Sequence, residues 1–593
     1  MNQRWSLDSL YPSFEGKEYL EDKKKLETLI GKIASWKAPA SAEQALVVRT
    51  LKEFIADYEA YGKAFSRLFA FAQLTVSVDA RAEKAIKEID NMENMITVVP
   101  GAMTGFYNWV AGIDGLKDMV DGDAELGEYS FFISECVKKS KYMLSEKEEI
   151  LFATMKTTGS TSWTKLQEHL TSVVPVEIER NGKKEMLPLP VVRNLAFSTD
   201  AAERENAYKS ELAHYAKIED AVAFSLNGIK GEVINTAKLR GYESPLHMTL
   251  ENSRMDKETL DAMLTAIRES LPNFRKYFRK KAELLGRKNG LPFHDMFAPM
   301  GECNMHFTYE EAADYIVKNF GTFSPKLAAF ARKAFDSSWI DAETREGKRG
   351  GAFCDNLHCI GESRIMSNFD GSFSQTVTLA HELGHGYHGE CLMPAKFLNA
   401  DYPMPLAETA SIFCETIVKN AAIRESNAEE AFAILEQELQ DSSQVIVDIL
   451  SRYIFETNVV EKRGNGPLST EELKTLMLEA QKEAYGDGLD PERLHGCMWV
   501  CKPHYYSADY NFYNFPYAFG LLFAKGLYSE YLKNGEAFVA NYDKLLLATG
   551  RNNIADVAAT MGIDVRNADF WRSSLTLIAE EIEQFCQAAD KRK

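Results

Sequence analysis

The sequence predicts a mostly α-helical protein with a few short strands. Charged, amphipathic segments that contain little glycine fill residues 1–115, and helical patterns resume near residue 196 and continue to the end. The residues between them mix helical and strand patterns. We therefore divide the 593 residues into an N-terminal helical region (1–115), a small mixed α/β subdomain (116–195) and a large third domain (196–593).

The first two regions contain recognisable elements. Lys17–Trp36 and Ala42–Tyr61 are amphipathic segments typical of helices. In the mixed subdomain, Val173–Glu179 is typical of a strand, and Asn181-Gly182 suits the tight turn of a hairpin. The prolines in Met186–Pro190 indicate that the returning strand lies at a sheet edge.

The third region is mainly helical, with one short strand. Lys257–Ser270 and Pro272–Arg287 are two long amphipathic segments. Ser363–Phe369 is predicted to be a strand, and Asp370-Gly371 turns the chain toward the next helix.

Composition and charge narrow the classes of function. A net charge of −19 argues against nucleic acids and anionic membranes as main partners, although solubility explains most of that charge. The first ten residues have no apolar core typical of a signal peptide, and no apolar run is long enough to span a membrane. Nine scattered cysteines favour reduced thiols and a cytoplasmic location.

The most distinctive segment is His381-Glu382-x-x-His385. Ser372 and Gln375 have the spacing of a helix cap, and on a helix the two histidines project from one face, one turn apart. Two imidazoles at this spacing can hold one metal ion, and Glu382 can act as a general base on a metal-bound water. Alone, the motif arises by chance in about one chain in fifty of this length and composition.

A glycine inside this motif is a second signal. Gly384 weakens the predicted helix by up to about 1 kcal/mol. Close packing of the helix against another backbone would explain its presence.

Glu408 is the better of two candidates for a third metal ligand. His388 would be offset from the metal, and Cys391 stands where a metzincin has its third histidine. Glu408 lies among small and apolar residues of a predicted helix, where a carboxylate needs a partner, although it could instead cap a helix or form a salt bridge. Glu415, seven residues on, could hold the outer nitrogen of a ligand histidine.

Residues 504–517 combine one histidine with five tyrosines. Phenol and imidazole donors can stabilise the negative charge that develops on a carbonyl oxygen during hydrolysis. Tyr510 and Tyr517 are seven residues apart, and Tyr513 and Tyr517 are four apart and would share a helix face. An aromatic core or a dimer contact is an equally good interpretation of this cluster.

Three motifs in order resemble the zinc oligopeptidases of the thimet oligopeptidase family, peptidase family M3, and most closely the oligoendopeptidase F branch. They are HELGHGYH (381–388), PLAETASIFCE (405–415) and HYYSADYNFYNFPYAFG (504–520), and WSLDSLYPSF (5–14) and GKRGGAFC (347–354) add to the likeness. The resemblance implies a multi-helical, zincin-like fold with a deep substrate channel and a small sheet beside the motif helix.

The resemblance also implies a function and a set of site residues. The chain would be a zinc-dependent endopeptidase of short, unstructured oligopeptides, with one Zn²⁺ per chain and residues 196–593 as its catalytic domain. The matching residues are His381, His385 and Glu408 as zinc ligands, Glu382 as the base that activates the zinc-bound water, and His504, Tyr510 and Tyr517 as donors in the transition state. Tyr513 could replace Tyr510 in that role.

Two other functions stay open. A dipeptidyl carboxypeptidase would need a cation that captures the substrate's C-terminal carboxylate, for which Arg364, Lys502 and Arg572 are candidates. A non-catalytic peptide-binding protein is the second alternative, against which the intact motif and Glu408 argue. In either enzyme, the strand Arg364–Phe369 could pair with an extended substrate.

Overall fold

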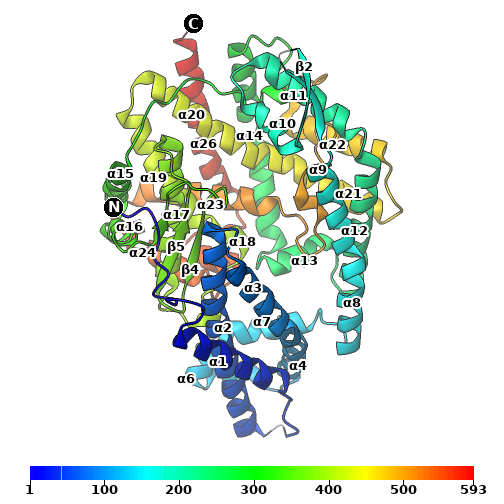
Figure 1. Cartoon of the computed structure of the whole chain (residues 1–593), viewed down its shortest axis with the longest axis vertical. Helices are drawn as coiled ribbons and strands as arrows, with labels where there is room; N and C mark the ends of the chain where they lie inside the picture. The colour runs from blue at the N-terminus through cyan, green and yellow to red at the C-terminus, as the bar shows by residue number, and fades with distance from the viewer. Residues whose placement is uncertain (42, 181, 593) are drawn as a thin grey trace. The chain divides into compact units, whose positions relative to one another are not determined.

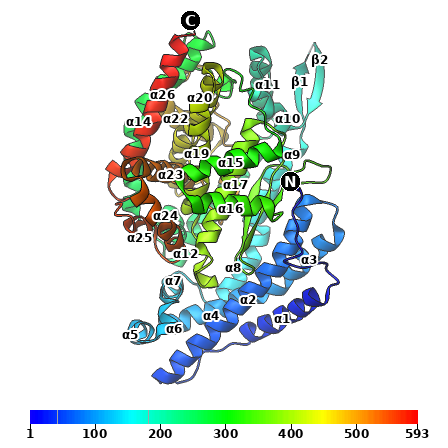
Figure 2. The same ribbon diagram turned by 90° about the vertical axis from the view of Figure 1, so that its left-hand side faces the viewer.

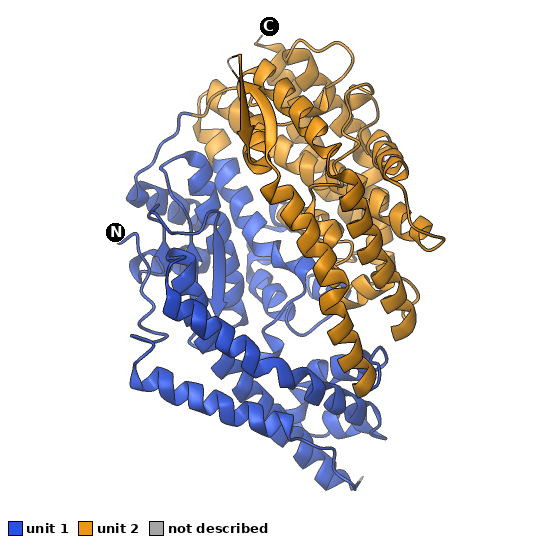
Figure 3. Ribbon diagram, turned by 45° about the vertical axis from the view of Figure 1, so that its right-hand side comes forward, with its two compact units in different colours: residues 1–146, 304–421, 531–562 blue, residues 147–303, 422–530, 563–593 orange. Residues whose placement is uncertain are grey.

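The computed structural model describes residues 1–41, 43–180 and 182–592, which form helices and two small sheets (Figure 1). This confirms the predicted mostly α-helical class. The chain divides into two compact units, coloured separately in Figure 3. Unit 1 comprises residues 1–146, 304–421 and 531–562, and unit 2 comprises residues 147–303, 422–530 and 563–593. The division into three consecutive regions stays a prediction.

Unit 1 contains the N-terminal helices, the three-stranded sheet and the motif helix that packs on this sheet. Its elements are α1 (Lys17–Ala34), α2 (Gln44–Val78), α3 (Glu83–Met95), η1 (Ile96–Val98), α4 (Val99–Ala111), α5 (Leu116–Asp121), α6 (Ala124–Gly127), α7 (Ser130–Ser140), α15 (Tyr309–Phe323), α16 (Pro325–Asp336), β3 (Ile340–Asp341), β4 (Phe353–Leu357), β5 (Glu362–Met366), α17 (Phe373–Leu392), η4 (Phe397–Asn399), α18 (Met404–Ala407), most of α19 (Thr409–Glu425), α24 (Glu536–Ala548) and α25 (Ile554–Ala559).

Unit 2 contains the hairpin and the longest C-terminal helix. Its elements are α8 (Glu146–Thr158), α9 (Ser160–Val173), β1 (Val176–Arg180), β2 (Lys183–Leu187), α10 (Leu189–Asn194), η2 (Leu195–Phe197), α11 (Ala201–Tyr215), α12 (Glu219–Arg240), α13 (Pro245–Asn252), α14 (Lys257–Leu284), η3 (Phe293–Asp295), α20 (Ala428–Ser443), the π-helical turn η5 (Gln444–Asp448), α21 (Ile449–Arg463), α22 (Thr470–Tyr485), η6 (Gly486–Gly488), η7 (Pro503–Tyr506), most of α23 (Phe515–Asn534) and α26 (Ala568–Asp590).

Apolar faces at helical spacing build the core of unit 1. Helix α1 packs along α2 (Figure 2), and their buried side chains include Ile33 and Leu51. The rings of Phe54 and Phe106 stack with centroids 3.8 Å apart. The predicted helix Ala42–Tyr61 is confirmed from Gln44 onward, while Ala42 lies outside the described residues. Helix α2 continues to Val78 because its apolar face stays buried against the core.

Helix α14 of unit 2 differs from the prediction of two segments. It runs from Lys257 to Leu284 with Pro272 inside it. Its apolar stripe packs along α26 on both sides of the proline, and Figure 2 shows these two helices side by side. The packing of a long buried face therefore outweighs the hydrogen bond that the proline cannot donate.

The hairpin of unit 2 confirms the two predicted strands in part, because Val173 still belongs to α9 and the returning strand ends at Leu187, where Leu189 and Pro190 begin α10. β1 and β2 pair antiparallel from Val176 opposite Leu187 to Arg180 opposite Lys183. The predicted turn residue Asn181 lies outside the described residues.

The three-stranded sheet of unit 1 has the order β3-β5-β4. β5 pairs in parallel with β3, where Ile340 faces Ile365, and antiparallel with β4, where Phe353 faces Met366. Because β5 is hydrogen-bonded on both sides, the expectation that the strand Arg364–Phe369 pairs with a substrate is wrong. Strand β4 occupies an edge instead, and α17 packs on β4 and β5.

Candidate metal and catalytic site

Helix α17 carries the H-E-x-x-H motif and begins where the sequence predicts. The Ser372 hydroxyl accepts a hydrogen bond from the backbone N–H of Gln375 at 3.3 Å, which caps the helix. His381, Glu382 and His385 follow two to three turns later, and the two imidazole rings lie with centroids 4.9 Å apart. The motif therefore presents both histidines on one face of a well-anchored helix.

Gly384 lets α17 approach the next helix closely. A Cβ atom at this position would come within 2.6 Å of the carbonyl oxygen of Ala410 and of the Cα atom of Ser411. The prediction that this glycine serves close backbone packing is confirmed. The contact brings the start of α19 against the motif.

Glu408 lies at a break between two helices, rather than within the single helix that the sequence predicts. It follows α18 and precedes α19, with φ −86° and ψ 3°. Its Oε2 atom lies 3.2 Å from His381 Nε2 and 3.4 Å from His385 Nε2. The Ser411 hydroxyl donates a hydrogen bond to the same oxygen at 2.8 Å.

These three residues have the chemistry and spacing of a metal site. One donor atom from each of His381, His385 and Glu408 lies within 4.8 Å of the other two. Two imidazole nitrogens and one carboxylate oxygen are the ligands that zinc takes in hydrolases, with a fourth position left for water or substrate. Burial opposes the charge of Glu408, but hydrogen bonds from the two histidines hold the pKa of its carboxyl far below the ordinary value.

Glu415 holds the outer nitrogen of His381, as its spacing from Glu408 predicts. Its Oε2 atom lies 3.1 Å from His381 Nδ1. The Nδ1–H group of His381 then donates a hydrogen bond to Glu415, which directs Nε2 at the site, where a bound metal ion would displace the proton of Nε2. Although burial opposes it, the hydrogen bonds to Glu408 and Glu415 raise the pKa of His381 to about 10.

Two residues that contact the site were not predicted from the sequence. Lys419 forms an ion pair with the second oxygen of Glu415, one helical turn away, so its i,i+4 spacing was a usable signal. The amide of Asn356, on β4, donates a hydrogen bond to the carbonyl oxygen of His385 at 3.0 Å. No local pattern could have found Asn356, because it lies 29 residues from His385 in the chain.

Glu382 and His388 lie on the same helix in different surroundings. The Glu382 side chain belongs to the buried part of α17, and burial raises the pKa of its carboxyl. His388 is fully buried, stacks on Tyr402 with ring centroids 4.1 Å apart, and has its Nε2 atom 2.8 Å from the Thr549 hydroxyl. His388 is therefore a core residue and lies outside the ligand group.

The tyrosine-rich stretch belongs to unit 2 and connects η7 with α23. The His504 ring stacks on Tyr513 at 5.6 Å between centroids and meets Tyr517 edge-on at 6.1 Å. Tyr513 also contacts Tyr517 at 5.4 Å and Tyr510 at 6.0 Å, and Tyr510 is 68% exposed. The four predicted side chains therefore form one aromatic cluster with Tyr513 at its centre.

A buried ion pair anchors this stretch and was not predicted. Lys230 Nζ lies 2.7 Å from Glu456 Oε1 and donates to the Asn511 side chain at 3.1 Å. The Glu456 carboxylate also accepts hydrogen bonds from the backbone N–H of Phe512 at 3.0 Å and from the amide of Asn514 at 2.8 Å. Phe512 has a positive φ of 52°, so the pair holds a strained backbone between Tyr510 and Tyr513.

His504 is neutral at ordinary pH. Burial, helped by the nearby cations Arg452 and Lys502, lowers its pKa to about 4. A neutral imidazole carries one N–H donor, as the proposed role of this residue requires.

The three candidate cations for carboxylate capture differ in their surroundings. Arg364 is 2% exposed, and its guanidinium donates to Ser6, Ser9, Glu362 and Ser363, so it is fully used within unit 1. Arg572 pairs with Glu269 and Asp569. Lys502 lines a cavity of unit 2.

A helix that carries H-E-x-x-H, beside a carboxylate that completes a group of three metal ligands, defines the class of the protein as a metallopeptidase. Comparison with known proteins gives the particular family. The family profile described as peptidase family M3 matches residues 194–577, and the one described as oligopeptidase F matches residues 113–173. The chain belongs to peptidase family M3.

Individual relatives agree with this assignment. Oligopeptidase PepF of Bacillus subtilis is 24% identical over 98% of this chain and 86% of its own length. A chromosomal oligoendopeptidase F of Lactococcus lactis is 26% identical over 69% of this chain and 68% of its own.

Solved structures show the same fold. A peptidase from Chlamydophila abortus has a TM-score of 0.82 at 21% identity, covering 99% of this chain and 98% of that one. Oligoendopeptidase F from Enterococcus faecium has a TM-score of 0.69 at 19% identity, covering 97% and 99%. The predicted zincin-like peptidase fold is confirmed. Of the helices that the structure describes, none is long and apolar enough to cross a membrane.

Proposed function

We propose that the protein is a zinc-dependent endopeptidase that hydrolyses internal bonds of short, unstructured oligopeptides. The observation that carries the proposal is the meeting of His381, His385 and Glu408 donor atoms within 4.8 Å, on the helix that also carries Glu382. Membership of peptidase family M3 and the relatives named oligopeptidase and oligoendopeptidase F support the substrate class.

His381, His385 and Glu408 would hold the metal, and Glu415 would orient His381. Bound there, one Zn²⁺ ion would act as a Lewis acid and lower the pKa of water. Glu382 takes a proton from the attacking water and later passes it to the nitrogen of the leaving peptide. Because burial raises its pKa, Glu382 can hold that proton between the two steps.

His504, Tyr510 and Tyr517 are proposed to donate hydrogen bonds to the carbonyl oxygen on which negative charge develops. Their shared aromatic cluster and the neutral state of His504 support this role. Tyr513 contacts His504 directly, so it competes with Tyr510 for the same function. Phenylalanine variants at both positions separate them, because the true donor should lose kcat with little change in KM.

An internally quenched peptide blocked at both ends tests the proposal. The zinc-loaded protein should cleave it, a chelator should abolish cleavage, and Glu382→Gln should keep the metal while losing nearly all turnover. Cleavage of free-ended peptides alone would favour the carboxypeptidase alternative. Metal binding and peptide binding without any cleavage would favour a non-catalytic peptide-binding protein.

A further inference from the structure

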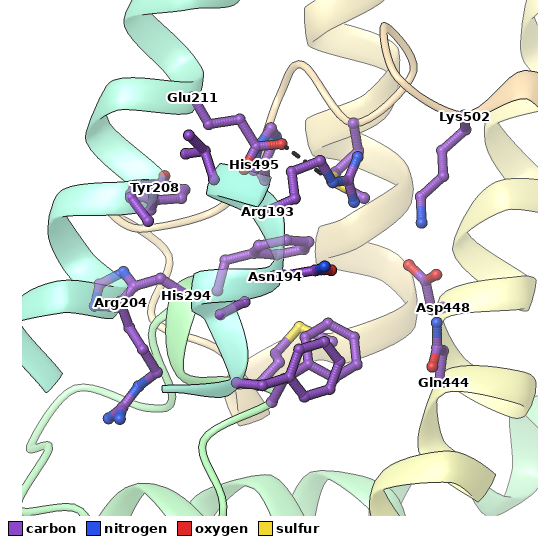
Figure 4. A pocket seen from close by; sticks show the side chains of 18 residues that line it. Arg193, Asn194, Arg204, Tyr208, Glu211, His294, Gln444, Asp448, His495 and Lys502 are labelled. Atoms are coloured by element: carbon purple, nitrogen blue, oxygen red, sulfur yellow. Dashed lines mark ion pairs between the residues drawn. The ribbon is translucent and has the colours of Figure 1, made fainter. Parts of the chain in front are cut away.

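Unit 2 contains a cavity of about 200 Å³ that the proposed reaction does not use. Its lining is divided in character (Figure 4). Phe197 and Phe297, with ring centroids 5.0 Å apart, form an apolar part, and Phe197 is 55% exposed. Such a combination of an apolar surface and a few convergent polar groups is typical of small-molecule sites.

Polar side chains from different segments meet in this cavity. Figure 4 shows Asn194, Gln444, Asp448 and Lys502 directed toward one another. Asn194 ends α10, Gln444 begins the π-helical turn η5, and Lys502 precedes η7. The amides of Asn194 and Gln444 are neutral donors, and Lys502 supplies a positive charge.

The charges around the cavity leave one cation uncompensated. Three arginines at or beside the cavity each have a carboxylate: Arg193 with Glu211 at 3.7 Å, Arg204 with Asp295 at 2.9 Å and Arg452 with Asp448 at 2.5 Å. Within the described residues, Lys502 has no carboxylate within 4.0 Å and no hydrogen-bond acceptor. The cavity therefore carries an excess of one positive charge.

The surroundings of Lys502 disfavour its positive charge. Burial, and then repulsion from Arg452, lower the pKa of Lys502 to about 8. The negative charge of Asp448 offsets these effects only in part, because its carboxylate also accepts from Arg452 and from the Tyr485 hydroxyl at 3.3 Å. A bound anion would compensate the positive charge of Lys502 and raise the pKa of its ammonium group back toward the ordinary value.

From this arrangement we infer that the cavity binds an organic monocarboxylate that carries an apolar group. The carboxylate pairs with Lys502 and accepts hydrogen bonds from the Asn194 and Gln444 amides, while the apolar group packs on Phe197 and Phe297. A single negative charge fits better than a phosphate dianion, because Asp448 and Glu211 border the same space. The inference stands independently of the proposed peptidase mechanism.

Two sources share this chemistry. One is the C-terminal residue of a bound peptide, and the other is a separate small carboxylate such as a released amino acid derivative. The experiments below use defined probes to distinguish them.

Calorimetric titration of the full chain with N-acetyl-L-leucine, and with N-acetyl-L-leucine amide as its uncharged equivalent, tests the site. The carboxylate probe should bind at least tenfold more tightly than the amide. Lys502→Met should lower its affinity at least tenfold, whereas Lys165→Met, at an exposed lysine of the same unit, should leave it unchanged. Equal binding of both probes, binding unaffected by Lys502→Met, or no binding of the carboxylate would overturn the inference.

A second variant keeps the test valid if Lys502→Met does not fold. Asn194 is exposed and ends its helix, so Asn194→Leu should fold normally and should weaken the carboxylate probe several-fold. Unchanged binding in a folded Asn194→Leu protein would contradict the proposed contacts.

Paired peptide substrates with a free or an amidated C-terminus identify the source. If the cavity takes the peptide's own end, amidation raises KM in the wild type and has no effect in Lys502→Met. If it takes a separate carboxylate, the two peptides have equal KM while the probe still binds. Because binding is measured directly, an inactive protein would contradict the proposed function without contradicting the site.

Discussion

Lys230 and Glu456 form an ion pair in the interior of unit 2, with Nζ 2.7 Å from Oε1 and both side chains 1% exposed. Glu456 accepts two further hydrogen bonds, from the Phe512 backbone and the Asn514 amide. This pair therefore connects the core of unit 2 to the segment that carries Tyr510 and Tyr513.

Removing one charge of this pair should be far more damaging than removing both. Glu456→Gln leaves the Lys230 ammonium buried without a compensating negative charge, so we expect a loss of about 3–5 kcal/mol in the free energy of unfolding. The double variant Lys230→Met/Glu456→Gln should recover most of that loss, because no buried charge stays unpaired. Urea unfolding measures both, and equal midpoints for the single and double variants would argue against the pair's proposed role.

Gly384→Ala should damage the metal site through packing. The new methyl group would overlap the backbone of Ala410 and Ser411, so α17 and α19 must separate, at a cost of about 1–3 kcal/mol. Zinc affinity, measured by competition with a chelator, should fall because Glu408 moves with α19. Gly31→Ala is the matched control, since a methyl group there meets nothing within 4 Å and should be neutral or slightly stabilising.

Glu415→Gln should weaken zinc binding without removing any proposed ligand. The amide can still accept from His381, but it lacks the charge that increases the basicity of that imidazole, so we expect a 10- to 100-fold loss of affinity. Glu390→Gln serves as the control, because it makes the same replacement of a carboxylate by an amide near the C-terminal end of α17. Unchanged zinc affinity in Glu415→Gln would contradict the orienting role.

His388 should make stability depend on pH. Burial lowers its pKa to about 3, below the ordinary 6.5, so between these values the unfolded chain binds a proton that the folded protein excludes. The stability contribution is complete above pH 6.5 and decreases as pH falls, by up to about 1.4 kcal/mol per pH unit.

Urea unfolding between pH 7 and pH 5 measures this slope. His388→Phe retains a ring against Tyr402 but cannot bind a proton, so its stability should fall less steeply with acid than that of the wild type. Identical slopes for the two proteins would show that His388 does not titrate as its burial indicates.

Local patterns predicted much of the helical structure and the centre of the site. The i,i+4 spacing of His381 and His385, the cap at Ser372 and the glycine at Gly384 are properties of one helix, so they can be recognised without knowing its neighbours. The contact of Glu415 with His381 could also be predicted from the sequence, because Glu415 lies two helical turns beyond Glu408. The roles of these residues remain the subject of the experiments above.

Only the tertiary structure decided features that depend on distant partners. The break that directs Glu408 toward α17, the central place of β5 and the continuity of α14 through Pro272 each result from packing between remote segments. The same holds for Arg364, whose guanidinium donates to four acceptors, and for Lys502, which has no carboxylate within 4.0 Å among the described residues. Burial and pairing are properties of the folded chain, whereas residue type and helical spacing are written in the sequence, which is why the motif was recognisable and its surroundings were not.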